Sequence, residues 1–231
     1  MKNILAIDTS TEACSVALLM GVEVIEQFEV ARQRHTELVL PMVDVILEEA
    51  GISIASVDVL AFGRGPGSFT GIRIGTGVVQ GIALGAGLPV APVSSLAAIA
   101  QGVYRTGGHK QVIAAIDARM QEIYWGCFQL DEKGYMQATQ AEVVAKPEGL
   151  PLPAGDNWFA AGTAWSAYED ELNSLINEKV KEYDGDYLPH AQDIATLARD
   201  VIEKGQLVSA DCVEPVYLRN EVAWKKTKPM E

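Results

Sequence analysis

Short apolar runs separated by turn residues make up the first thirty residues. Runs at 4–7, 14–20 and 22–30 are divided by the turn Asp8-Thr9-Ser10-Thr11 and by Gly21. Such runs and turns are typical of β-strands joined in hairpins. The pattern predicts a three-stranded antiparallel meander, whose first turn gathers a carboxylate and three hydroxyl groups at the end of a strand. These groups suit a phosphate or a magnesium-bound water, or Asp8 caps the turn through its own backbone.

A helical spacing of apolar residues follows from His35 to Ala50. Eight of the ten positions from 38 to 47 are apolar, which is more than the single stripe of a surface helix requires. The predicted helix therefore needs cover on two sides. Its own sheet would supply one side, and a second subunit or a later segment of this chain would supply the other.

A glycine-rich segment occupies residues 63–75, directly after the apolar run 57–62. It reads Gly-Arg-Gly-Pro-Gly-Ser-Phe-Thr-Gly-Ile-Arg-Ile-Gly. Glycine permits positive φ and close backbone approach, and Ser68 and Thr70 are candidate N-caps of a following helix. The segment predicts a cradle of amide groups for an anion or a carbonyl, unless its glycines serve packing alone. It lacks the Gly-Lys-Ser/Thr ending of a Walker loop and the acidic residue of a dinucleotide-binding loop.

A stretch without charged residues extends from Ile74 to Tyr104. Only about 15 residues of it precede Pro89, fewer than the roughly 20 that a membrane-spanning helix needs. We expect a buried helix over 70–86, a strand near 88–93 and a second helix that ends near Tyr104. In the first helix a glycine recurs every fourth residue, at 77, 81 and 85. Because each helical glycine costs about 1 kcal/mol, close packing along this face should offset the loss.

The order of the first half then recurs in a shorter form. After a glycine-containing seam at 104–110, the apolar run 112–116 closes on Asp117, as residues 4–7 close on Asp8. Further strands are expected at 123–130, 135–145 and 158–162, and helices at 165–176 and 193–203. The repetition predicts an α/β protein of two related lobes: residues 1–106, joined by the C-terminal segment 207–231, and a smaller lobe of residues 107–206.

Charge and cysteine content narrow the classes of function. The net charge of −13 counts against a free-standing nucleic-acid binder, because phosphate neutralisation supplies most of that affinity. Three widely separated cysteines indicate neither a disulfide framework nor a zinc knuckle. The basic tail around Trp224, Lys225 and Lys226 is expected to be a solvated end, with contact to RNA or an acidic partner as the alternative. No charged leader precedes the first strand, so we expect a cytoplasmic protein.

Motifs for catalysis are few. His35 is followed four residues later by Val39, so the helical metal-binding pattern His-x-x-x-His is absent. Ser68 lacks the Gly-x-Ser-x-Gly spacing of a hydrolase elbow. Asp8 and Asp117 form the best acidic pair, since such residues in a two-lobed ATPase face a central cleft and bind magnesium or activate water. We expect no catalytic residue and no metal site in this chain.

Several of these segments resemble the bacterial TsaB (YeaZ) family. The resemblance rests on Ile4-Leu5-Ala6-Ile7-Asp8-Thr9-Ser10, Arg34-His35-Thr36-Glu37, Gly65-Pro66-Gly67-Ser68-Phe69-Thr70-Gly71-Ile72-Arg73, Asp117-Ala118-Arg119 with Glu122-Ile123-Tyr124, and Pro215-Val216-Tyr217-Leu218-Arg219. The match covers essentially the whole chain. It implies an actin/Hsp70/acetate-kinase-like (ASKHA) fold of two lobes with mixed sheets, the second lobe reduced.

The resemblance also implies a function. Family members support a complex that transfers a threonylcarbamoyl group to the adenosine adjacent to the anticodon of tRNA, and they bind the catalytic paralogue TsaD and the ATPase TsaE. ATP and a divalent metal would belong to these partners, with no cofactor held by this chain, and tRNA would be reached only through the complex. Val39 stands where the paralogue carries its second metal-binding histidine, which agrees with an inactive, supporting subunit. A homodimer is expected when TsaD is absent.

Two sets of site residues follow from the resemblance and the spacing. The partner interface would lie on the first two helices, at His35, Leu38, Met42, Val45, Ile46, Ile72, Gly75, Val79 and Ile82. Residual phosphate or nucleotide contacts would come from Asp8, Ser10, Thr11, Gly65, Gly67, Ser68 and Asp117. One alternative is a small-molecule ATP-dependent kinase or ATPase of the same superfamily, against which the short second lobe counts. Another is a metal-dependent peptidase, whose metal site Val39 removes.

Overall fold

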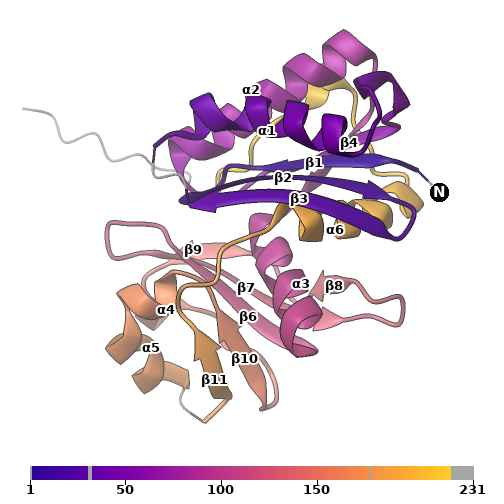
Figure 1. Cartoon of the computed structure of the whole chain (residues 1–231). Helices are drawn as coiled ribbons and strands as arrows, with labels where there is room; N and C mark the ends of the chain where they lie inside the picture. Colours follow the sequence, from indigo (N-terminus) through magenta and orange to yellow (C-terminus); the bar gives the residue numbers. More distant parts are fainter. Residues whose placement is uncertain (1, 31–32, 177, 220–231) are drawn as a thin grey trace, which may run out of the picture.

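Two β-sheets, each covered by helices on both faces, build the molecule (Figure 1). The computed structural model describes residues 2–30, 33–176 and 178–219, so the tail around Trp224 lies outside the described residues. The first half contains β1 (Ile4–Asp8), β2 (Ala13–Met20), β3 (Glu23–Val30), α1 (His35–Glu49), β4 (Val59–Gly63), α2 (Phe69–Ala86), β5 (Val90–Val93) and α3 (Ser95–Gly107). The second half contains β6 (Gln111–Asp117), β7 (Ile123–Leu130), β8 (Met136–Ala138), β9 (Val143–Ala145), β10 (Trp158–Ala161), α4 (Ala164–Ala167), α5 (Glu169–Ile176), β11 (Val180–Asp184) and α6 (Ala191–Glu203).

The first sheet has five strands in the order β3-β2-β1-β4-β5. Strands β1, β2 and β3 pair antiparallel, which confirms the predicted meander, and β4 and β5 join β1 in parallel. Strand β1 is buried on both faces. Its residues Leu5 and Ile7 pack in the core with α1 and α2, whereas Ile4 and Ala6 pack with α6. An all-apolar run is expected of such a doubly covered strand.

The second sheet repeats this topology. Its strand order is β8-β7-β6-β10-β11, with β9 as a further partner of β7. Antiparallel and parallel pairs fall in the same places as in the first sheet, as expected for two related lobes. The second lobe is the reduced one, because the stretch from β8 to β10 contains β9 and a single turn of 3₁₀-helix at Pro147–Gly149 where the first lobe has the 15-residue α1.

The last helix of each half packs on the sheet of the other half. Helix α3 follows β5 but packs its residues Leu96 and Ile99 against the second sheet. Helix α6 follows β11 but packs Ile194 and Ala198 against the first. The expected boundaries are therefore wrong for both helices, because α3 was assigned to the lobe of residues 1–106 and α6 to the lobe of residues 107–206. The amphipathic period of a helix shows that it has a buried face, but not which sheet that face meets. The layers run α1 and α2, first sheet, α6 with α3, second sheet, α4 and α5 (Figure 1).

Three further elements differ from the expectation. The helix expected at 165–176 is broken at Tyr168, whose φ of −135° ends α4 and whose hydroxyl donates to Asp117. The strand expected at 135–145 is two short strands, β8 and β9. Strand β11 was not predicted, because it is an edge strand with mostly exposed polar residues and lacks the apolar alternation that marks a strand.

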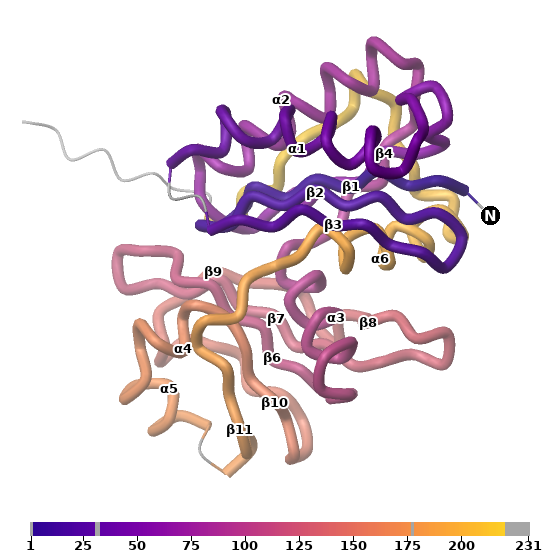
Figure 2. The backbone as a smooth tube through the Cα atoms, in the orientation of Figure 1, coloured from indigo at the N-terminus to yellow at the C-terminus, as the bar shows by residue number. Residues whose placement is uncertain are grey.

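The C-terminal strap, residues 207–219, returns along the first lobe beside α2 (Figure 2). Val208 forms a β-bridge with Val90, and the carbonyl of Ala210 accepts from Gln80 Nε2 at 3.1 Å. At its end Arg219 pairs with Glu122 of the second lobe. The strap therefore connects both lobes. Within the described part of the chain, no helix combines the length and the apolar character needed to cross a bilayer.

Candidate functional site

The glycine-rich segment packs directly on the turn between β1 and β2. A Cβ added to Gly67 would lie 2.2 Å from the carbonyl oxygen of Ser10, and one added to Gly71 would lie 2.1 Å from that of Thr9. The amide of Ser68 donates to the Ser10 carbonyl at 2.7 Å. The predicted amide cradle thus holds a carbonyl, and that carbonyl belongs to the chain itself. The glycines are present because the two backbones approach too closely for any side chain.

Asp8 is buried at the centre of this contact, with 1% of its surface exposed. Its Oδ1 accepts from the amide of Ser10 at 3.0 Å and from the Ser10 hydroxyl at 2.9 Å. Burial raises the pKa of the Asp8 carboxyl to about 7 and outweighs these two hydrogen bonds, which lower it. The geometry is that of a carboxyl that caps its own turn.

Asp117 has the same role at the end of β6. Its Oδ1 accepts from the amide of Arg119 at 2.8 Å and from the hydroxyl of Tyr168 at 3.0 Å. Arg119 Nη2 also lies 3.8 Å from an oxygen of Glu12, next to the first turn. This contact brings the two aspartate turns near one another, but each carboxylate is engaged by its own turn.

The expected phosphate contacts are mostly internal to the fold. Five of the seven are buried: Asp8, Ser10, Thr11, Gly65 and Gly67. Asp117 is half-buried, and Ser68 is exposed at the N-terminus of α2, where its hydroxyl accepts from the Gly71 amide at 3.4 Å. The glycine-rich segment was correctly predicted to allow close approach to its backbone. The group that approaches it is the turn after β1 of the same chain, and the prediction had assigned that place to a phosphate.

The predicted partner interface is split between the core and the surface. Six of its nine residues are buried within the chain, namely His35, Met42, Ile46, Ile72, Gly75 and Val79. These six do not form an exposed contact surface, so this part of the prediction is wrong. Val45 is 47% exposed, and Leu38 and Ile82 are half-buried. Apolar spacing on a helix with two apolar sides does not distinguish the side that meets the sheet from the side that meets solvent.

His35 lies inside the first lobe. Its ring Nε2 donates to the carbonyl of Thr11 at 2.9 Å and lies 3.2 Å from that of Ala13, so it pins the start of α1 to the first turn. Val39, one turn further along, is buried in the core. Within residues 2–30, 33–176 and 178–219, no group of three or more His, Cys, Asp and Glu side chains is arranged to hold a metal ion.

The outer face of α2 carries an exposed row of residues at a spacing of four. The row consists of Phe69, Arg73, Gly77, Gly81 and Gly85. A Cβ added to any of the three glycines would meet nothing within 4 Å. The close packing expected along this glycine face is therefore not made by the residues that the structure describes. Leu84 on the same helix is 76% exposed and Leu40 on α1 is 50% exposed, two surface residues that the sequence prediction missed.

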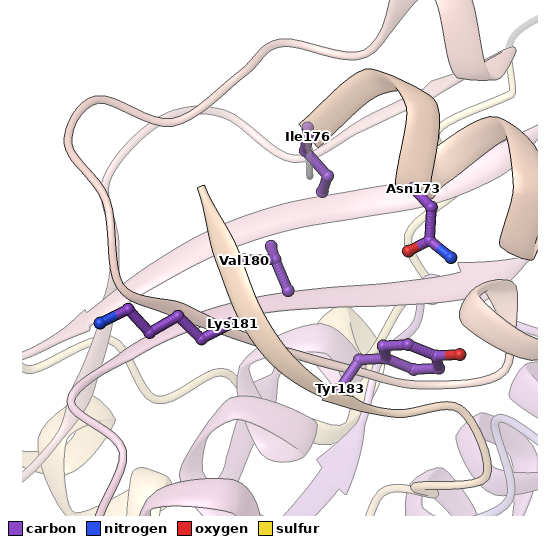
Figure 3. Close-up of a pocket in the computed structure, with 5 residues that line it drawn as sticks. All are labelled: Asn173, Ile176, Val180, Lys181 and Tyr183. Carbon is purple, nitrogen blue, oxygen red and sulfur yellow. The ribbon is translucent and has the colours of Figure 1, made fainter. Parts of the chain in front are cut away.

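One cavity, with a volume of about 360 Å³, lies on the second lobe between α5 and β11 (Figure 3). It is lined by residues of no predicted motif, and Lys181 extends away from the ring of Tyr183. The other has a volume of about 470 Å³ and lies between the lobes, where Arg64, Ser94 and Glu142 meet. Sequence reasoning missed Ser94 and Glu142 because they come from segments far apart in the chain.

Comparison with known proteins places the chain in a family. A family model described as TsaD, tRNA N6-adenosine threonylcarbamoyltransferase, matches residues 23–227. The tRNA threonylcarbamoyladenosine biosynthesis protein TsaB of Escherichia coli K12 is 46% identical over 230 residues, which cover 96% of this chain and 97% of the relative. TsaB of Haemophilus influenzae is 44% identical over 236 residues and covers 98% of both chains.

A solved structure agrees with these relatives. The structure described as YeaZ from Pseudomonas aeruginosa is 46% identical, covers 94% of this chain and 100% of its own, and superposes with a TM-score of 0.88. The expected α/β fold of two lobes with mixed sheets, the second lobe reduced, is confirmed. Because the relatives match over nearly their full length and the folds superpose, the chain belongs to the TsaB (YeaZ) family of tRNA threonylcarbamoyladenosine biosynthesis proteins.

Proposed function

We propose that this chain is the supporting, non-catalytic subunit of the complex that transfers a threonylcarbamoyl group to the adenosine adjacent to the anticodon of tRNA. It would bind the catalytic paralogue TsaD, and the ATPase TsaE would join the assembly. ATP and a divalent metal would act in those partners. The names of the relatives, tRNA threonylcarbamoyladenosine biosynthesis protein TsaB, support the pathway.

The exposed glycine row of α2 is the observation that carries the proposal. Each helical glycine costs about 1 kcal/mol relative to alanine, and nothing in the described chain lies within 4 Å of the positions where side chains would stand at 77, 81 and 85. A partner helix that packs against the bare backbone would offset this cost through close van der Waals contact. Exposed apolar side chains lie nearby: Leu84 on α2, and Leu40 and Val45 on α1.

The polar residues of the first turn support a non-catalytic role. In an ATPase they would hold phosphate or magnesium, whereas here Asp8 and Ser10 bond to one another and Ser68 donates its amide to Ser10. His35 likewise bonds to backbone carbonyls. These side chains stabilise the fold. No feature of the described residues favours the kinase alternative over the supporting role.

The same face would join two copies of this chain when TsaD is absent. A two-fold interface uses one surface patch twice, and a glycine row can pack on a second glycine row without a steric conflict. TsaD would then displace one copy and form a complex with one chain of each kind.

The experiment is a measurement of molar mass by light scattering, for the chain alone and after mixing with TsaD. Gly81→Trp places a large side chain on the outer face of α2. Ser174→Trp, at an exposed position of α5 on the second lobe, is the matched control. We expect the unmodified chain and the Ser174 variant to dimerise alone and to form one-to-one complexes with TsaD.

The Gly81 variant should be a monomer when measured alone and should form no complex when mixed with TsaD. Its circular dichroism spectrum should match that of the unmodified chain. If Gly81→Trp binds TsaD as the control does, this face is not the interface. If the unmodified chain does not bind TsaD at all, the proposed supporting role itself is wrong.

A further inference from the structure

The cavity between the lobes is lined by apolar and polar side chains, with Arg64, Ser94 and Glu142 together at one polar end. Val93 of β5 and Leu197 of α6 line it from the first lobe, and Phe128 of β7 and Met136 of β8 line it from the second. Its volume of about 470 Å³ lies in the range of about 300–1,000 Å³ that small-molecule sites occupy. Walls from both lobes make it a site whose shape depends on how the lobes sit together.

At the polar end of the cavity, the guanidinium group of Arg64 has a donor, Nε, that makes no hydrogen bond to the described residues. The backbone of Arg64 is fixed on both sides, because its amide donates to Val93 at 2.9 Å and its carbonyl accepts from Val216 at 2.8 Å. The side-chain Nε is buried and has no hydrogen-bond partner among the described residues. A buried donor without a partner is costly, and a bound acceptor would remove that cost.

Glu142 faces the same end of the cavity. Its carboxylate accepts a hydrogen bond from the hydroxyl of Ser94, which caps the N-terminus of α3. Burial raises the pKa of Glu142, while Ser94 and the charge of Arg64 lower it. Arg64 and Glu142 thus influence one another, yet within the part of the chain that the structure describes no ion pair joins them. Among the described residues no hydrogen bond is made to the second carboxylate oxygen, which can therefore accept one from a ligand.

The charges of the lining decide the class of ligand. Arg64 is the one cation among the described lining residues, and the lining carboxylates are Glu142 and Asp200, of which Asp200 pairs with Lys204 Nζ at 2.6 Å. A polyphosphate carries several negative charges that the single guanidinium cannot balance, and it would also meet the carboxylate of Glu142, so it is disfavoured. A ligand with one carboxylate for Arg64 and one donor for Glu142 leaves the charges paired, and an apolar body would contact Phe128 and Met136.

We propose that the cavity at Arg64, Ser94 and Glu142 binds a small organic acid that carries a carboxylate, an adjacent ammonium or hydroxyl group, and an apolar body. The carboxylate accepts from Arg64 Nε. The ammonium or hydroxyl donates to Glu142. The site is separate from the outer face of α2 and does not depend on the binding of TsaD.

Four probes of similar apolar body test this chemistry by amide NMR titration of the full chain. L-Valine carries both groups as carboxylate and ammonium, and 2-hydroxy-3-methylbutanoate carries carboxylate and hydroxyl. 3-Methylbutanoate has the carboxylate alone and 2-methylpropylamine the ammonium alone. We expect the first two to shift the amides of Ser94, Phe128 and Met136 saturably below about 10 mM. The single-group probes should bind at least about tenfold more weakly, since each loses a charge-assisted hydrogen bond.

Substitutions of Arg64 and Glu142 test which group of the ligand each side chain binds. Arg64→Met should abolish binding of both two-group probes, and Glu142→Gln should weaken L-valine more than 3-methylbutanoate. Lys181→Met, which removes an exposed cation beside the other cavity (Figure 3), is the matched control and should change nothing. If Arg64→Met disturbs the whole spectrum, Arg64→Lys, which keeps the charge but lacks the Nε donor, replaces it and should weaken the same probes.

Three outcomes would overturn the proposal. The first is the absence of shifts around the cavity with every probe up to about 10 mM. The second is binding of L-valine that survives Arg64→Met unchanged. The third is equal affinity for L-valine and 2-methylpropylamine, which would show that no carboxylate is recognised.

Discussion

Gly63 lies directly against the carboxyl group of Asp8, so that a Cβ added to Gly63 would stand 1.8 Å from Asp8 Oδ2. The two residues end neighbouring parallel strands, β4 and β1. The pairing explains why glycine occupies the end of β4. Any side chain there would push the Asp8 turn away from the glycine-rich segment that packs on it.

Substitution by alanine should separate the two kinds of glycine in this chain. Gly63→Ala should lower the free energy of unfolding by about 1–3 kcal/mol, because the new methyl group overpacks the Asp8 turn. Gly77→Ala should raise it by about 1 kcal/mol, because alanine favours the helix and its methyl group meets open space. Urea unfolding of both variants measures the difference. Equal losses in the two variants would contradict this account of the glycine-rich segment.

Asp8 should make stability fall as the pH rises towards 7. The pKa of its carboxyl is about 7 in the folded chain, against the ordinary aspartate value of 3.8 that applies to the unfolded chain, so between these values the folded state holds the extra proton. The free energy of unfolding should therefore decrease by about 1.4 kcal/mol per pH unit across this window and level off above pH 7.

Asp8→Asn tests this dependence because its amide keeps the size and one oxygen acceptor but does not titrate. Its stability should lack the Asp8 contribution to the slope, and above pH 7 it should exceed that of the unmodified chain by about 1–3 kcal/mol. Urea unfolding at pH values from 5 to 8 gives both curves. Parallel curves for the two proteins would mean that Asp8 stays ionised in the fold.

Arg219 should hold the hairpin between β6 and β7 in its unusual conformation. Arg119, Met120 and Gln121 all have φ near +60°, which costs about 1 kcal/mol or more for each non-glycine residue. Arg219 Nη2 donates to the Ala118 carbonyl at 3.1 Å and pairs with Glu122. Arg219→Ala should speed amide hydrogen exchange at 118–122 and lower stability by about 1–3 kcal/mol.

The exposed arginine of the same hairpin is the control for Arg219. The side chain of Arg119 is 77% exposed, and its removal should cost no more than about 1 kcal/mol. Arg219→Lys should restore part of the protection at most, because lysine cannot present two parallel donors to Glu122. Full protection in Arg219→Ala would show that the hairpin holds its shape alone.

The pair of Arg105 and Asp193 should bind α3 to α6. Arg105 donates to both oxygens of Asp193, each at 2.9 Å, and Asp193 is 1% exposed. Arg105→Met should cost about 3–5 kcal/mol near pH 7, because it leaves a buried carboxylate without a partner. The loss should shrink at acid pH, since burial already raises the pKa of Asp193 and the group can take up a proton.

A second substitution shows whether the unpaired charge causes that loss. Asp193→Asn in the Arg105→Met background should recover much of the stability, as measured by urea unfolding at pH 5 and 7.5. Strictly additive effects of the two substitutions would contradict direct coupling of these residues.

Much of the local structure could be predicted because it depends on local signals. Apolar runs bounded by turn residues located β1 and β2, and helical spacing located α1 and α2. Ser68 was a correct candidate N-cap because capping involves residues three positions apart. Strand β11 was missed and the helix at 165–176 was continuous in the prediction. In both cases a tertiary contact decides the structure: pairing with β10 for the strand, and the bond of Tyr168 to Asp117 for the helix break.

The site could be predicted only in part, for the same reason. The sequence by itself determined the family, the two repeated strand-aspartate units and the segment that requires glycine, since each is written in neighbouring residues. Only the tertiary structure decided that the glycines receive the Asp8 turn of the same chain, that α6 covers the first sheet, and that no described residue covers the glycine row of α2. Packing direction depends on which surfaces meet across the whole chain, and the periodicity of a single segment carries no information about its partner.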